Sequence, residues 1–63
     1  MIYTIEKRAA FGYGSMESWY ECRCYERRTP IGVLVKGKCL KKCKKKSDAR
    51  DYFGKKGISY EEL

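Results

Sequence analysis

The chain has no histidine and few acidic residues. Without an imidazole, the commonest general base and the commonest nitrogen ligand for metals are both missing. Eight Asp and Glu residues stand against fifteen Lys and Arg residues, and no acidic pair stands out as a means of activating a nucleophile. We therefore predict that the protein is not an enzyme.

Long hydrophobic runs are also missing. The first eight residues, MIYTIEKR, contain no apolar segment of signal-peptide length, and no later segment reaches the roughly 20 residues that span a bilayer. We expect no membrane span and a cytoplasmic location. In that reducing compartment disulfides are less expected, and zinc or free thiols more so.

The chain is also short. A chain of 63 residues predicts a single domain, 1–63, with a small core. Ordering each residue costs about 1.5 kcal/mol, while burial returns about 25 cal/mol per Å², so the two nearly cancel in a small chain. An additional stabilising cross-link is expected, and the four cysteines are the candidates, either as two disulfides or as the ligands of one metal ion.

The positive charge is what the sequence has in excess. A net charge of +7 on so small a surface favours anionic partners such as DNA or RNA. The simpler interpretation is that the charge only keeps the protein soluble.

The longest run of strand-forming residues lies at 18–28, SWYECRCYERR. Side chains alternate between the two faces of a strand, so this run predicts one buried, thiol-rich face and one exposed face that is basic and aromatic. The buried face is predicted to carry Tyr20, Cys22 and Cys24, and the exposed face Trp19, Arg23, Tyr25 and Arg27.

Two further strands are expected around it. Residues 1–7 alternate as a strand, residues 9–16 read as a loop because of their two glycines, and residues 29–32 (TPIG) predict a type I turn. The β-branched run that follows predicts a strand over 33–39. The aromatic residues of the loop could touch a ligand, although closing the sheet edge is the simpler role.

The C-terminal third predicts a helix over 48–56. Ser47 is a good N-cap, and Gly57 suits a Schellman ending with a contact between Phe53 and Ile58. Residues 59–62 repeat a capping pattern that predicts a new helical turn. The fold class is therefore α+β, a three-stranded antiparallel sheet with one C-terminal helix packed on one face.

The turn at 29–32 also predicts the register of the hairpin. If Arg28 pairs with Val33, Cys22 lies opposite Cys39 and Cys24 opposite Gly37, so three sulfurs meet on one face of the sheet. Cys43 follows Cys39 by four residues, a spacing that brings the fourth sulfur back. The predicted metal site, with zinc as the ion, is Cys22, Cys24, Cys39 and Cys43.

Two alternatives to zinc remain open. Disulfides would have to link the two cysteine pairs, with Cys22 to Cys39 as the first, because both bridges within a pair have poor geometry. Alternatively, all four cysteines are reduced and act as small apolar core residues.

The same register places Arg23 opposite Lys38 and Tyr25 opposite Lys36 on the exposed face. Cations neutralise phosphates, while tyrosine, tryptophan and arginine stack on bases. The predicted nucleic-acid-binding residues lie on this ribbon and on the lysine-rich segment after it: Trp19, Arg23, Tyr25, Arg27, Lys36, Lys38, Lys41, Lys42 and Lys45.

Three antiparallel strands followed by one helix resemble, in layout, the arm-type DNA-binding domains of phage integrases, which read the major groove with the sheet. This resemblance implies a DNA-binding accessory or regulatory module of a phage or mobile element, either a monomer or a small homo-oligomer. The alternative is a protein-interaction module, such as a phage-type inhibitor or adaptor, that docks on an acidic surface of a host protein.

Overall fold

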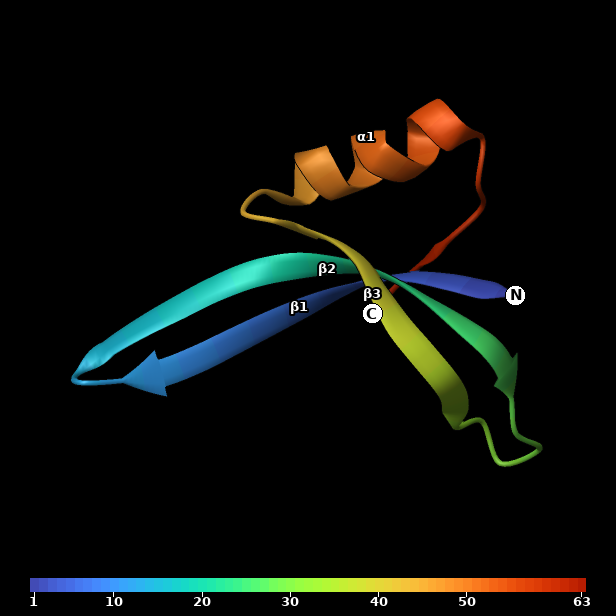
Figure 1. The fold of residues 1–63 in the computed structure, drawn as a ribbon, viewed down its shortest axis with the longest axis horizontal. Coiled ribbons are helices and arrows are strands. Elements are labelled where there is room, and N and C mark those ends of the chain that lie inside the picture. The colour runs from blue at the N-terminus through green and yellow to red at the C-terminus, as the bar shows by residue number, and fades with distance from the viewer.

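The structure, a computed structural model, describes all 63 residues and contains one helix and four strands (Figure 1). The sheet order is β3-β2-β1-β4. The strand pairs β1–β2 and β2–β3 are antiparallel, and β1–β4 is parallel. The elements are β1 (Ile2–Gly12), β2 (Ser15–Arg28), β3 (Leu34–Cys43), α1 (Lys46–Lys56) and β4 (Glu61–Glu62).

The first hairpin is longer than predicted. Tyr13 and Gly14 both adopt positive φ angles, 50° and 77°, as a two-residue type I′ turn requires. The chain therefore reverses within two residues, and the ladder between β1 and β2 continues without a break from Ile2↔Tyr25 to Gly12↔Ser15. The prediction of a loop over 9–16 was wrong, because the turn uses only one of the two glycines.

The register of the second hairpin differs from the predicted one by a single residue. Gly32 has φ 89°, and Thr29 N donates to Val33 O at 2.8 Å, so the loop consists of three residues. Arg28 consequently pairs with Leu34, and Arg23 pairs with Cys39. The predicted pair of Cys22 with Cys39 was wrong, because a slip of one residue moves Cys39 to the other face of the sheet.

A β-bulge then changes the register a second time. Arg23 pairs with Cys39, but Cys22 pairs with Lys41, which leaves Leu40 as the extra residue of β3. Beyond the bulge, Cys43 lies opposite Tyr20 and is buried.

The helix is two residues longer at its start than predicted. It begins at Lys46, with Lys45 as an N-cap that makes no side-chain hydrogen bond, so the prediction of Ser47 as the cap was wrong. Its end is as predicted: Gly57 is left-handed, and Ile58 N donates to Phe53 O at 3.1 Å. Together with the bond from Gly57 N to Gly54 O, this confirms the Schellman motif.

The last residues form β4 rather than the predicted helical turn. Leu63 N donates to Ile5 O at 2.9 Å, and Arg28 and Arg50 hold the two glutamates of β4 through ion pairs with Glu61 and Glu62. The α+β class with one helix is confirmed, but the sheet has four strands and is mixed, not three antiparallel strands. Sequence patterns missed β4 because its pairing partner is at the other end of the chain.

The core lies between α1 and the sheet. Phe53 is fully buried and packs with Ile5, Cys22, Cys43 and Ala49. Tyrosine rings surround it, with ring centroids 5.8 Å away for Tyr3, 5.6 Å for Tyr52 and 5.3 Å for Tyr60. One phenylalanine thus joins β1, α1 and the segment that leads into β4.

Gly37 of β3 lies directly beneath the ring of Tyr25, and a Cβ atom at this position would overlap ring atoms. We expect Gly37→Ala to displace Tyr25 and lower the free energy of unfolding by about 1–3 kcal/mol, as overpacking does. Urea unfolding followed by circular dichroism measures the change. The control is Gly54→Ala in α1, where a Cβ meets nothing within 4 Å and helix propensity predicts a gain of about 0.5–1 kcal/mol. Equal effects of the two variants would contradict the close packing at Gly37.

Candidate nucleic-acid interface

The predicted ribbon is formed only in part. Trp19, Arg23 and Tyr25 share the sheet face away from α1, as predicted, and Arg27 lies farther along the same strand.

The two predicted lysines of β3 lie elsewhere. Lys38 lies opposite Cys24 on the side of α1, and Lys36 lies beside Glu26, with 3.9 Å between Nζ and Oε2. Gly37, not Lys36, lies opposite Tyr25. The register slip therefore removes both lysines from the ribbon.

Two glutamates, Glu6 and Glu21, occupy the same face and neutralise Arg8 and Arg23. Arg23 Nη1 donates to Glu21 Oε1 at 2.7 Å, and Arg8 Nη2 donates to Glu6 Oε1 at 2.8 Å. The Tyr25 hydroxyl donates to Glu6 Oε2 and accepts a hydrogen bond from Arg23 Nε at 3.1 Å. Arg23 and Tyr25 therefore already have partners within the protein, and this face is weaker as a phosphate-binding surface than the sequence predicted.

Sequence reasoning missed this network because it treated β2 and β3 without β1. Glu6 and Glu21 are cross-strand partners, and each has an arginine two residues later on its own strand, Arg8 and Arg23. Residues two apart on a strand share a face, so this repeated spacing was the available signal.

Burial and hydrogen bonding shift the pKa of the Glu21 carboxyl group in opposite directions. The hydrogen bond from Trp19 Nε1, 2.8 Å from Glu21 Oε2, makes the largest contribution and lowers the pKa of the carboxyl group. Arg23 lowers the pKa further, while burial raises it. The net result is a pKa below the usual 4.5.

This shift predicts a loss of stability in acid. A carboxylate whose pKa is lower in the folded than in the unfolded protein stabilises the fold above pH 4.5. That contribution disappears as the pH falls from 4.5 through the folded-state pKa. We expect the urea midpoint to drop over this range in the wild type and to drop less in Glu21→Gln. Identical pH profiles for the two proteins would contradict the role of Glu21.

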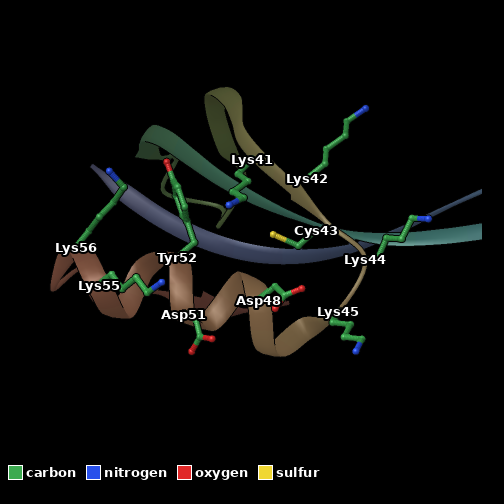
Figure 2. A pocket seen from close by; sticks show the side chains of 10 residues that line it. All are labelled: Lys41, Lys42, Cys43, Lys44, Lys45, Asp48, Asp51, Tyr52, Lys55 and Lys56. Carbon is green, nitrogen blue, oxygen red and sulfur yellow. The ribbon is translucent and has the colours of Figure 1, made fainter.

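The strongest concentration of positively charged side chains lines a groove between the end of β3 and α1 (Figure 2). Its volume is about 750 Å³. Lys41 and Cys43 point toward the helix, whereas Lys42 points away from it (Figure 2). The lining residues are Lys41, Lys42, Cys43, Lys44, Lys45, Asp48, Asp51, Tyr52, Lys55 and Lys56. We call this the lysine groove.

Tyr52 forms one wall of the lysine groove between two cations. Lys41 Nζ lies 5.4 Å and Lys56 Nζ 5.1 Å from the centre of the ring. Such cation–π contacts hold both ammonium groups near an aromatic face without neutralising them. Six lysines against two aspartates leave the lysine groove with a surplus of positive charge. It is therefore suited to an anionic ligand that also carries a planar group.

The lysine groove unites some of the predicted residues and adds others. Lys41, Lys42 and Lys45 were predicted as binding residues and all line it. Sequence reasoning missed the contribution of α1, namely Tyr52, Lys55 and Lys56. The available signal was their spacing, because residues three and four positions apart lie on one side of a helix.

The four cysteines do not converge. Cys22 and Cys43 lie in the core beneath α1, where Cys22 Sγ is 3.6 Å from Ala49 O. Cys24 is buried elsewhere on β2, and Cys39 is exposed on the opposite face. No group of three or more His, Cys, Asp or Glu side chains is placed to hold a metal ion. The arrangement does not fit the predicted four-sulfur zinc site, and zinc stays a prediction from the sequence alone.

The burial of the thiols predicts their reactivity. Burial, with a further contribution from Cys43, raises the pKa of Cys22 to about 11, which keeps it protonated and unreactive at neutral pH. We expect iodoacetamide to modify Cys39 rapidly and the three buried cysteines only after unfolding in urea, as peptide mass spectrometry would detect. Native mass spectrometry with and without a chelator is the complementary measurement. Protection of Cys39 that a chelator abolishes would favour the zinc site instead.

Comparisons with known proteins add no assignment. No protein-family model matches the chain, no curated protein is detectably similar to it, and no solved structure matches its fold. The resemblance in layout to integrase DNA-binding domains therefore gains no support from them. The only helix, α1, is too short and too polar to cross a membrane.

Proposed function

We propose that the protein is a small nucleic-acid-binding module that holds a sugar-phosphate backbone in the lysine groove. The observation that supports this proposal most strongly is the clustering of six lysines around one groove with Tyr52 in its wall. Ammonium groups bind phosphates as point charges and release condensed counterions, and this release drives association with DNA or RNA. The setting that we propose is a cytoplasmic accessory or regulatory role, as a monomer or a small homo-oligomer.

The lysine groove replaces the sheet ribbon as the main contact surface in this proposal. Arg23 of the ribbon is held by Glu21 at 2.7 Å, and Arg8 beside it by Glu6 at 2.8 Å, so a phosphate would have to compete with these carboxylates at this part of the face. The lysines of the groove have no such partner: none of the six takes part in an ion pair, although Asp48 and Asp51 are nearby. Free cations next to an aromatic ring match a nucleotide better than neutralised ones do.

Salt-dependent binding tests the proposal. Fluorescence anisotropy with a labelled strand of about 20 nucleotides, single and as a duplex, gives the dissociation constant between about 50 mM and 200 mM salt. Contacts with about four phosphates predict a slope near −3 to −4 for the logarithm of the association constant against the logarithm of salt concentration. Absence of salt-dependent binding to both forms would overturn the proposal.

Polyglutamate of equal charge is the comparison ligand, because it is anionic but has no bases. Binding to polyglutamate as tight as to the strand would favour the alternative function, docking on an acidic protein surface. Under the present proposal polyglutamate binds more weakly, because Tyr52 has no planar group to stack on.

A further inference from the structure

The distal half of the first hairpin projects from the rest of the molecule. β3 pairs with β2 only from Tyr20 onward, and β4 pairs with β1 only at Thr4 and Ile5. Residues 7–18 therefore form a two-stranded extension with no third strand and no helix over it, and each of them is exposed. Figure 1 shows this extension running outward from the region beneath α1. We call it the arm.

The tip of the arm is apolar. Phe11 and Met16 are direct cross-strand partners, with 76% and 71% of each residue exposed, and Tyr13 in the turn is fully exposed. The type I′ turn and the hydrogen bond from Ser15 Oγ to Gly12 O, 3.1 Å long, hold these side chains at the end of the arm. A two-stranded hairpin gains little stability by itself, and nothing in the fold covers this tip. Its three large apolar side chains thus serve no packing role within the protein.

The root of the arm adjoins the lysine groove. Lys44, which lines the lysine groove, also lines a smaller hollow of about 320 Å³ with Glu17, Ser18 and Trp19 of β2. Lys42 Nζ lies 5.7 Å from the centre of the Trp19 ring. From Trp19 to Gly14 the arm is about 17 Å long at the usual rise of a strand. That length corresponds to about five nucleotide steps along one stacked strand.

We propose that the arm inserts its tip against nucleobases that lie about five nucleotides along the strand from the phosphates held in the lysine groove. This inference rests on the proposed function and adds to it the mode of contact. Phe11, Tyr13 and Met16 supply stacking faces and an apolar wedge, the type of side chain that enters between base steps or holds an unstacked base. The contact selects planar bases rather than charge, so it complements the lysine groove.

Two other occupants of the tip are disfavoured by charge and size. A second copy of the chain also carries +7, and the repulsion opposes its approach. An anionic lipid surface would be attracted, but three side chains on a narrow tip bury little apolar area in a bilayer. Bases presented on an anionic backbone match both the charge and the size of this surface.

The test uses the full chain with Phe11, Tyr13 and Met16 all changed to alanine. The matched control is Ile31→Ala, since Ile31 is 87% exposed but lies in the β2–β3 turn. We expect the triple variant to bind the labelled strand at least about 10-fold more weakly, with an unchanged salt slope because no phosphate contact is lost. The control should bind as the wild type does. Running the single strand and the duplex in parallel distinguishes stacking on an unpaired base from wedging into a duplex.

The outcomes separate this inference from the function on which it rests. A wild type that binds with the expected salt slope, beside a triple variant of equal affinity, overturns the role of the arm and leaves the lysine groove in place. A wild type that shows no salt-dependent binding overturns the function itself. Loss of a wild-type dimer in sedimentation, or of wild-type binding to phosphatidylserine vesicles, with strand binding unchanged in the triple variant, assigns the tip to that occupant and overturns the inference.

Discussion

Phe53→Ala should remove about half or more of the free energy of unfolding of the protein. Phe53 is fully buried, and its ring contacts Tyr3, Tyr52 and Tyr60, so truncation leaves a cavity at the point where α1 meets the sheet. Phenylalanine-to-alanine substitutions in cores cost about 3–5 kcal/mol. Domains have about 0.05–0.15 kcal/mol of stability per residue, which gives a chain of this size only about 3–9 kcal/mol in total.

Urea unfolding followed by circular dichroism and by Trp19 fluorescence measures this loss. The matched control is Phe11→Ala, which removes the same atoms from an exposed side chain and should change the free energy of unfolding by less than about 0.5 kcal/mol. If Phe53→Ala is too unstable to purify, Phe53→Leu should still lower the urea midpoint measurably. Equal midpoints for the Phe53 and Phe11 variants would contradict the placement of the core.

The second large effect is expected from the lysine groove. Replacing Lys41, Lys44 and Lys45 by glutamine should weaken binding to the labelled strand about 100- to 1,000-fold near 0.1 M salt. The reason is counterion release, because each phosphate contact contributes roughly a factor of ten at that concentration. The salt slope should become less steep by about one for each lysine removed.

The control for this variant removes the same charge from another place. Changing Arg27, Lys36 and Lys38 to glutamine also lowers the net charge by three but leaves the lysine groove intact. We expect a loss of less than about 10-fold, because only the general field of the protein is reduced. A larger loss in the control than in the groove variant would return the contact surface to the ribbon predicted from the sequence.

Local patterns in the sequence determined much of the local structure. Alternation in 18–28 correctly separates Cys22 and Cys24 from Arg23 and Tyr25, because the side chains of a strand alternate whatever its partner is. The end of the helix at Gly57 was also readable, because a Schellman motif depends on residues within one turn. The positive charge of the segment after Cys39 required only counting.

Which segments meet was decided by the tertiary structure. The length of the loop at Gly32 and the bulge at Leu40 determine the faces of the sheet on which Cys39 and Cys43 lie. They therefore decide whether the sulfurs of the predicted metal site can meet. The network that joins Arg23 and Tyr25 to Glu6 depends on the pairing of β1 with β2, and the lysine groove depends on α1 packing beside β3. Local preference acts between neighbours in sequence, whereas register and packing depend on the sum of many weak contacts between distant residues. A shift of the strand register by one residue therefore leaves little trace in the sequence, yet it changes which side chains meet at the site.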